Sequence, residues 1–332
     1  MLGWLILHAG IGAGGTWLAR RYALGRDLLD HPGERRSHAI ATPRGGGVAV
    51  VISLLVAAIA LALRDPSQRP VLLAFAAGLT LVAGVGMVDD HRPLSPWLRL
   101  SVHLLAALIL GGAVQALHGQ WWLSILAVAG ALVLTNVWNF MDGINGIASS
   151  QALVFGGVLA WLGSGVWAWL ALALAAACAG FLPFNFPRAR IFLGDVGSGA
   201  LGFAIAALAA GAIGSQGLEH SIALSLPLSA FLVDAGLTLM RRIFRGERWW
   251  LPHTQHAYQV WARRSGHTVV TAAYVAWTVS GAIAMMVLME ARVSPLVAWA
   301  ACAAWYSAAG LAWAVLQGWN PERITTMNRD SE

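Results

Sequence analysis

Residues 70 to 90 read PVLLAFAAGLTLVAGVGMVDD, an apolar run that ends in two adjacent acids, Asp89 and Asp90. A helix of about 20 apolar residues crosses the roughly 30 Å hydrocarbon core of a bilayer. Two neighbouring carboxylates at the end of a helix repel each other and oppose the helix macrodipole. A divalent cation or a basic partner would make their charge useful there. The stretch therefore predicts a transmembrane helix with a reactive end, and a solvated helix end is the alternative.

The composition of the whole chain agrees with a membrane protein. Hydrophobic residues make up 58% of the 332 residues, charged residues make up 11%, and 17 residues are tryptophan. This composition excludes a soluble core and is typical of a chain dissolved in lipid and anchored at the interfaces. The net charge of +6 is spread over short segments between apolar runs, so we expect membrane orientation and no nucleic-acid binding.

Eleven apolar runs are long enough, or nearly so, to span the bilayer. They lie near residues 2–19, 46–63, 70–88, 97–116, 121–140, 146–163, 166–184, 199–214, 221–240, 268–289 and 294–317. The first run lacks a basic leader, so it predicts a retained helix and not a cleavable signal peptide. No repeat, low-complexity tract or soluble segment interrupts the pattern. The sequence thus predicts one all-α polytopic membrane domain over residues 1–332, with about 11 transmembrane helices.

The arginines fix the expected orientation, because they alternate sharply between successive connections. Only Arg64, Arg69 and Arg292 fall on one side, and the others fall on the opposite side: Arg20, Arg21, Arg26, Arg35, Arg36, Arg44, Arg92, Arg99, Arg188, Arg190, Arg241, Arg242, Arg245, Arg248, Arg263, Arg264, Arg323 and Arg329. The positive-inside rule makes the richer side cytoplasmic. It predicts a periplasmic N-terminus, a cytoplasmic C-terminus and an active site at the cytoplasmic face, where most polar residues gather.

A polar stripe closes the fifth apolar run. Asn136, Asn139 and Asp142 recur every three residues, and Asn145 follows between two glycines. This spacing keeps the first three within one broad helix face, where amide and carboxylate oxygens could converge on a cation or a nucleotide. Interhelical hydrogen bonding is the alternative for Asn136.

The connection after the seventh run carries Asn185 and then the glycine-rich stretch Phe-Leu-Gly-Asp-Val-Gly-Ser at residues 192–198. Glycines around an acid just before a helix let the backbone approach a phosphate while the carboxylate holds a metal. Gly194, Asp195 and Ser198 are therefore candidate site residues.

The longest connection, residues 241–267, carries six arginines and the run Pro-His-Thr-Gln-His-Ala-Tyr-Gln at residues 252–259. His253 and His256 could bind zinc, but no third ligand stands beside them. Contact with phosphate or sugar is the preferred interpretation, and an interfacial amphipathic segment is the alternative. Asp234 lies inside the ninth run and either pairs with a buried arginine or supports the site from behind.

The first cytoplasmic connection contains Arg44 followed by Gly45, Gly46 and Gly47. Positive-inside charge explains the arginine. A triple glycine at the start of a helix predicts close backbone approach to a neighbour or a ligand.

Taken together, four motifs in order resemble the polyprenyl-phosphate N-acetylhexosamine-1-phosphate transferases, glycosyltransferase family 4. They are Asp89–Asp90, the run Asn-Val-Trp-Asn-Phe-Met-Asp-Gly-Ile-Asn-Gly at 136–146, and the two runs at 192–198 and 252–259. The resemblance covers residues 30 to 267. The Pro-Arg-Gly-Gly-Gly and His-Thr-Gln-His versions look more like the branch that initiates O-antigen than the peptidoglycan branch.

The resemblance implies that a lipid phosphate attacks a UDP-linked N-acetylhexosamine (GlcNAc, FucNAc or QuiNAc type), giving a lipid diphosphosugar and UMP. It implies catalytic roles for Asp89, Asp90, Asp142, His253 and His256. It implies Mg²⁺, with Mn²⁺ as an alternative ion, on Asp195, Asp90 and Asp142. Substrate contacts are expected from Arg44, Asn136, Asn139, Asn145, Asn185, Gly194 and Ser198. Many members have an aspartate where this chain has Asn145. A role that needs a negative charge is therefore not carried over to Asn145.

The expected partners are a UDP-N-acetylhexosamine, undecaprenyl phosphate and the lipid bilayer, in a bacterial inner membrane. Dimers occur among relatives, so a homodimer is one expected assembly. A polytopic transporter or flippase for a lipid-linked sugar is the alternative function. Transporters place ionisable groups near the bilayer midplane, whereas here the candidate acids lie at helix ends and only Asp234 among them lies inside a predicted span.

Overall fold

The computed structural model describes residues 1–31, 40–216, 218–251 and 253–318, and for residues 215–216 and 218–221 the backbone alone. Arg35, Arg36, Arg323, Arg329 and Pro252 lie outside this part. The described elements, in chain order, are α1 (Leu2–Gly25), β1 (Leu29–Asp30), β2 (Thr42–Pro43), α2 (Val48–Arg64), α3 (Arg69–His91), α4 (Pro96–His118), α5 (Trp121–Met141), α6 (Ile147–Leu162), α7 (Gly165–Asn185), α8 (Asp195–Gln216), the 3-10 helix η1 (Leu218–Ser225), α9 (Ser229–Phe244), α10 (Ala257–Ser265), α11 (His267–Glu290) and α12 (Pro295–Gly318).

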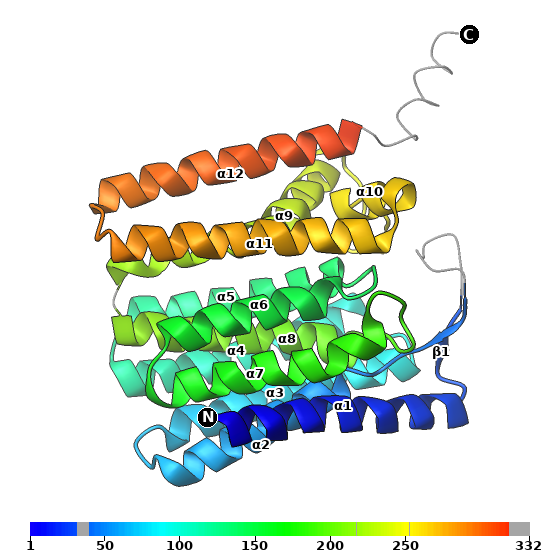
Figure 1. Cartoon of the computed structure of the whole chain (residues 1–332), viewed down its shortest axis with the longest axis horizontal. Coiled ribbons are helices and arrows are strands. Elements are labelled where there is room, and N and C mark those ends of the chain that lie inside the picture. Colours follow the sequence, from blue (N-terminus) through cyan, green and yellow to red (C-terminus); the bar gives the residue numbers. More distant parts are fainter. Residues whose placement is uncertain (32–39, 217, 252, 319–332) are drawn as a thin grey trace.

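The long helices lie side by side across the molecule, and consecutive ones run in opposite directions (Figure 1). Among the described residues, eight helices are long and apolar enough to cross a membrane, and α2 and α6 are shorter apolar helices. The predicted all-α polytopic class is therefore confirmed. The number of spans and their orientation stay predictions.

The ninth predicted run, residues 221–240, is not one continuous helix, and that part of the prediction is wrong. The chain forms η1, then a turn, and α9 begins only at Ser229. Pro227 lies in this turn. Proline has no backbone N–H and clashes with the preceding turn of a helix, so it separates the two segments.

Close helix packing depends on small residues, as is usual between helices in lipid. A Cβ atom on Gly12 of α1 would collide with the backbone carbonyl of Ala177 on α7. A Cβ atom on Gly180 of α7 would collide with the backbone carbonyl of Ala9 on α1. Gly202 of α8 lies equally close to the backbone of α5 at Leu134. Among the eight long apolar helices, α8 is the most enclosed, with 94% of its apolar stretch buried. Its first residues therefore begin inside the bundle.

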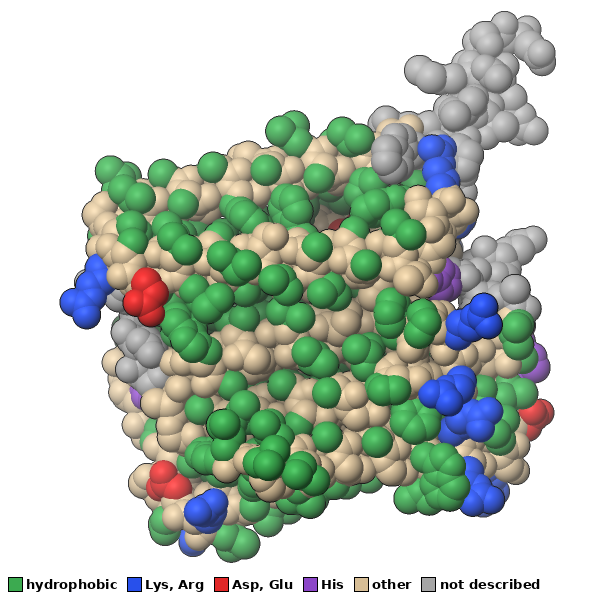
Figure 2. Space-filling view, viewed as in Figure 1, with side chains coloured by type: hydrophobic (Ala, Val, Ile, Leu, Met, Phe, Trp, Pro, Cys, Tyr) green, Lys and Arg blue, Asp and Glu red, His purple; other side chains and the backbone are tan. Residues whose placement is uncertain are grey.

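The surface separates into an apolar flank and a charged end. Figure 2 shows hydrophobic side chains over the helix flanks, while most of the arginines gather at the end where β1 and α10 lie. Helices satisfy their own backbone hydrogen bonds, so an apolar helix flank can face lipid. The exposed apolar flanks are therefore the surfaces expected to face lipid.

The glycine triplet lies against the start of α8, as its composition predicts. The N–H groups of Gly46 and Gly47 donate to the carbonyls of Phe192 and Leu193 at 2.9 and 2.8 Å. A Cβ atom on Gly46 would approach the Phe181 ring within 2.8 Å. This close contact holds the residues before α8 against the segment that leads into α2.

Candidate active site

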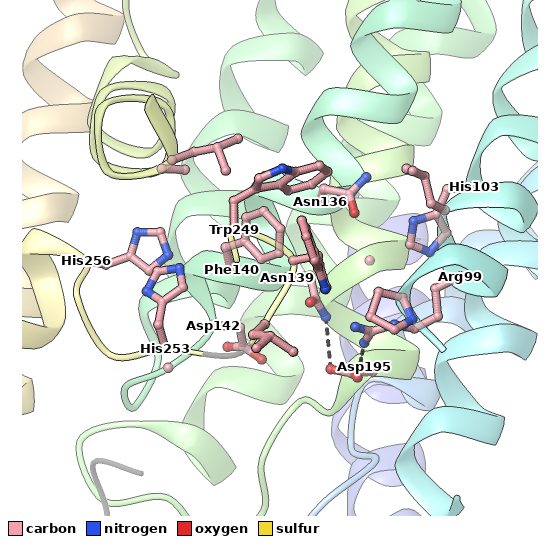
Figure 3. Close-up of a pocket in the computed structure, with 18 of the residues that line it drawn as sticks. Arg99, His103, Asn136, Asn139, Phe140, Asp142, Asp195, Trp249, His253 and His256 are labelled. Carbon is pink, nitrogen blue, oxygen red and sulfur yellow. Dashed lines mark hydrogen bonds and ion pairs between the residues drawn. The ribbon is translucent and has the colours of Figure 1, made fainter. Parts of the chain in front are cut away.

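Polar residues from four distant segments line one cavity of about 330 Å³ at the arginine-rich end (Figure 3). The cavity lies between the start of α4, the end of α5, the start of α8 and the connection after α9. Its polar lining consists of Arg99, His103, Asn136, Asn139, Asp142, Asp195, His253, His256, Tyr258 and Gln259, and Trp97, Trp249 and Trp250 belong to its aromatic wall.

Asp90 holds the N-terminus of α8. Its two carboxylate oxygens accept the backbone N–H groups of Asp195 and Val196, both at 3.1 Å. The last turn of α3 thereby meets the positive end of the α8 dipole, which offsets the unfavourable position of an acid at a helix C-terminus. The side chain of Asp90 is only 7% exposed. The sequence indicated a metal or catalytic group here, and the structure adds a capping role.

Gly194 makes this cap feasible. It adopts a left-handed backbone with φ of 76°. A Cβ atom at this position would lie 2.6 Å from the Oδ2 atom of Asp90. Any other residue would therefore be strained and would displace the capping carboxylate.

Arg99, in the first turn of α4, connects two of the predicted acids. Its Nη1 atom donates to Asp89 at 2.6 Å and to Asp195 at 3.2 Å. Asp89 also accepts the backbone N–H of Leu94 at 2.5 Å, so both of its oxygens are engaged. Asp195 keeps 36% of its side-chain exposure, whereas Asp89 keeps 10%. Asp195 is therefore the acid of this group that remains accessible from the cavity.

Asn139 fixes the other oxygen of Asp195. Its amide nitrogen donates to Asp195 Oδ1 at 2.9 Å and to the hydroxyl of Ser198 at 3.0 Å. The predicted polar face at the end of α5 and the predicted acid at the start of α8 therefore meet directly.

Asp142 follows the last residue of α5 and lines the same cavity (Figure 3). Burial raises the pKa of its carboxyl well above the usual value, and the negative charges of Asp195 and Asp90 raise it further. Asp142 is thus a buried carboxyl whose charged form is disfavoured further by two neighbouring acids. A cation would be attracted to it.

The two histidines lie together on the opposite wall. The ring centroids of His253 and His256 are 4.8 Å apart. Burial, followed by the charges of His256 and Arg242, lowers the pKa of His253 to about 3, so this imidazole is neutral near pH 7. Its Nδ1 atom accepts the backbone N–H of Gln255 at 3.2 Å, which leaves the proton on Nε2.

Asp234 supports this wall from behind, which decides between the two interpretations of this residue. It accepts the N–H groups of Ala257 and Tyr258 at 2.7 and 2.9 Å, and the hydroxyl of Tyr274 at 2.7 Å. Its Oδ1 atom also lies 3.7 Å from Nδ1 of His256. Asp234 caps α10 as Asp90 caps α8, and it pairs with no arginine among the described residues.

Two predicted substrate-binding residues, Asn185 and Asn145, have mainly structural contacts. Asn185 is 3% exposed; it accepts the N–H of Gly146 and donates to the carbonyl of Ile191. Asn145 donates to the carbonyl of Pro187 at 3.1 Å. Arg44 lies 4.0 Å from Asp90. Asn136 and Asn139 do line the cavity.

Arg99, His103, Tyr258 and Gln259 line the cavity and were not among the predicted site residues. The charge of Arg99 was attributed to membrane orientation. A signal was present: an arginine in the first turn of a helix faces the positive end of the macrodipole. Such a position calls for nearby carboxylates, and Asp89 and Asp195 supply them.

The acids do not form a ready cluster of metal ligands. Within the described ranges, no three histidine, cysteine or acidic side chains gather closely enough to hold a metal ion on their own. The metal set of Asp195, Asp90 and Asp142 stays a prediction.

Fold and site together define a multi-pass helical membrane protein with an acidic pocket at one end. The sequence profile described as glycosyl transferase family 4 matches residues 72–212. The chain is 29% identical over 280 residues to a decaprenyl-phosphate N-acetylglucosaminephosphotransferase of Mycobacterium leprae, which covers 70% of this chain and 69% of that protein. It is 31% identical over 229 residues to a phospho-N-acetylmuramoyl-pentapeptide-transferase of Heliobacterium modesticaldum, covering 59% and 69%. A second such transferase, from Moorella thermoacetica, is 35% identical over 204 residues, covering 52% and 63%.

This chain belongs to glycosyl transferase family 4, in the group of polyprenyl-phosphate sugar-phosphate transferases. The family expected from the four motifs is thereby confirmed.

Proposed function

We propose that this protein transfers an N-acetylhexosamine 1-phosphate from a UDP-sugar to undecaprenyl phosphate and releases UMP. The donor is of the GlcNAc, FucNAc or QuiNAc type, and the product starts lipid-linked O-antigen or a related polysaccharide. The reaction takes place at the cytoplasmic face of a bacterial inner membrane.

One observation carries the proposal: Asp142, Asp195, Arg99 and the two histidines come from distant segments and line one pocket at the arginine-rich end. The named relatives support the same chemistry, because their names give a sugar-phosphate group as the part transferred. The arginine distribution supports a cytoplasmic position for this end.

The chemistry suits a pocket that positions charge. A phosphate monoester has its second pKa near 6, so the lipid nucleophile is mostly a dianion at neutral pH and needs no strong base. Both oxygens of Asp89 are occupied by Arg99 and Leu94. We therefore assign Asp89 to holding Arg99 in place and not to general-base catalysis. Arg99 and the neutral His253 can both donate hydrogen bonds to phosphate oxygens.

The donor set fits Mg²⁺, with Mn²⁺ as an alternative ion. Mg²⁺ is usually bound through one or two carboxylates together with substrate phosphates, so a complete protein cage is not required. Asp195 and Asp142 face the same cavity, and burial, followed by the charges of Asp195 and Asp90, raises the pKa of Asp142. When bound, the ion would neutralise the reacting phosphates. Both oxygens of Asp90 and of Asp195 accept hydrogen bonds, but the Asp90 side chain is 7% exposed and the Asp195 side chain is 36% exposed. Asp195 and Asp142 are therefore the stronger candidates.

The assay follows UMP release from purified protein with a UDP-sugar, undecaprenyl phosphate and Mg²⁺. We expect turnover with at least one donor of this type, and loss of turnover in Asp195→Asn with the fold retained. A matched control is Ser307→Ala on α12, an exposed hydroxyl that bonds only within its own helix. Normal turnover in Asp195→Asn would refute the assignment of that acid, and absence of turnover with every donor would refute the proposed function.

A transporter or flippase is the competing function. It requires ionisable groups near the bilayer midplane. Asp234 is the residue that suggested this function, and its oxygens are taken up by the α10 cap and by Tyr274. Movement of a lipid-linked sugar without UMP release would favour this alternative.

A further inference from the structure

The end of α12 reaches the histidine-bearing wall of the pocket through one buried glutamine. Helix α12 is mostly exposed, and its buried residues in the described part are Ala298, Cys302, Ala309 and Gln317. Gln317 is 4% exposed and is the one polar member of this set. A buried amide on a lipid-facing helix is costly unless both of its ends are hydrogen-bonded.

Both ends of Gln317 are bonded, and they connect two parts of the connection after α9. The Nε2 atom donates to the backbone carbonyl of Gln255 at 2.7 Å. The Oε1 atom accepts from Nη1 of Arg241 at 2.6 Å. Arg241 in turn donates to the side-chain oxygen of Gln255 at 3.3 Å. Gln317, Arg241 and Gln255 therefore form a closed triangle of three hydrogen bonds.

Gln255 contacts His253, one of the two histidines that line the pocket. Its backbone N–H donates to Nδ1 of His253, which is the contact that leaves the imidazole proton on Nε2. Its side-chain nitrogen donates to Glu247 at 3.2 Å. His256 follows it in sequence and lies against Asp234. A displacement of the Gln255 backbone would thus change both the position and the tautomer of His253.

We propose that Gln317 is a positioning residue for the transfer reaction: through the Gln255 backbone, the C-terminal end of α12 holds His253 in the orientation and tautomer that meet the substrate phosphates. This inference rests on the proposed function, because it takes His253 as a substrate contact. The role of α12 is then to brace the active site from outside the helices that line it.

Two substitutions separate this role from simple packing. Gln317→Leu removes both hydrogen bonds at similar side-chain size. Gln317→Glu keeps an acceptor for Arg241 but has no amide hydrogen for the Gln255 carbonyl. We expect both variants to lower kcat by about tenfold, with the KM for the UDP-sugar changed by less than about threefold, because a misplaced group costs mainly transition-state stabilisation. Ser307→Ala is the matched control on the same helix and should match the wild type.

The decisive measurement combines Gln317→Leu with His253→Ala. If Gln317 acts through His253, the two effects are not additive, and Gln317→Leu causes little further loss of kcat in the His253→Ala background. Full turnover in Gln317→Glu, or the same fold loss in both backgrounds, would overturn the proposal.

Hydrogen exchange separates this proposal from the proposed function, since it needs no turnover. Exchange of the backbone amides at residues 253–256 should accelerate in Gln317→Leu and in Gln317→Glu and stay unchanged in Ser307→Ala. Unchanged exchange in both glutamine variants would refute the positioning role. Failure of the wild type to release UMP would refute the proposed function. The exchange result would then still decide whether Gln317 holds the Gln255 backbone and His253 in place.

Discussion

Replacing Asp90 by asparagine should lower the stability of the protein even when no divalent ion is present. The carboxylate accepts two backbone N–H groups at the start of α8, each at 3.1 Å. Asparagine offers one acceptor oxygen, and its NH₂ group would face the second N–H. A hydrogen bond to a charged group contributes about 1.5–3 kcal/mol. Because burying the carboxylate offsets part of this gain, we expect a net loss of about 2 kcal/mol.

The assay is thermal unfolding of Asp90→Asn and the wild type in detergent with EDTA. A loss of this size should lower Tm by about 3 °C in a chain of this length. Asp142→Asn is the control, since it removes a carboxylate from the same pocket without removing a helix cap. A purely metal-binding Asp90 would behave in the opposite way, because without the ion its removal relieves repulsion with neighbouring acids. An Asp90→Asn variant as stable as the wild type, or more stable, in EDTA would refute the capping role.

Three further predictions follow from the same contacts. Because the pKa of Asp142 is raised, the folded state holds a proton that the unfolded state loses above about pH 3.8. The stability of the protein in EDTA should therefore fall as the pH rises from about 3.8. Asp142→Asn should remove this fall when Tm is measured between pH 4 and pH 8. Arg99→Gln should reduce UMP release by about 100-fold, since it removes the charged donor between Asp89 and Asp195; a reduction of less than about threefold would contradict its role. The pKa of His253 is lowered from 6.5 to about 3, so between these values the unfolded state binds a proton that the folded state does not. Stability should therefore be lost as the pH falls from about 6.5 toward 3. His253→Asn should flatten this part of the Tm profile, and an unchanged profile would contradict the assignment of a neutral His253.

The helices could be predicted from the sequence because hydrocarbon imposes a simple requirement. A segment must be apolar and helical over about 20 residues, and both properties can be read locally. The prediction failed at Pro227, where composition alone suggested one helix over residues 221–240 and the chain forms η1 and α9. Hydropathy does not register a missing backbone N–H, and the proline had to be considered separately.

The site could be predicted in its members but only partly in its contacts. Asp142, Asp195 and the two histidines stood out because polar residues beside apolar spans are costly and call for a function. The partners of Asp90 could not be predicted in the same way, since a capping contact with Val196 depends on how α3 and α8 pack. Arg99 was hidden for a different reason: eighteen of the 21 basic residues lie on the predicted cytoplasmic side, and orientation explains such residues without any site.

The two fully engaged acids explain how the pocket can concentrate negative charge without losing its shape. Asp90 and Asp234 each accept two backbone N–H groups at the start of a helix, so the positive ends of α8 and α10 balance them. These two helix starts carry Asp195 and Tyr258, and both residues line the cavity. The acids that hold the walls are thus satisfied by the protein itself. Asp142, which holds a proton while no cation is bound, and the exposed part of Asp195 are left with oxygens that a cation and the substrate phosphates would complete. This is the division of roles that a phosphate-transferring site requires.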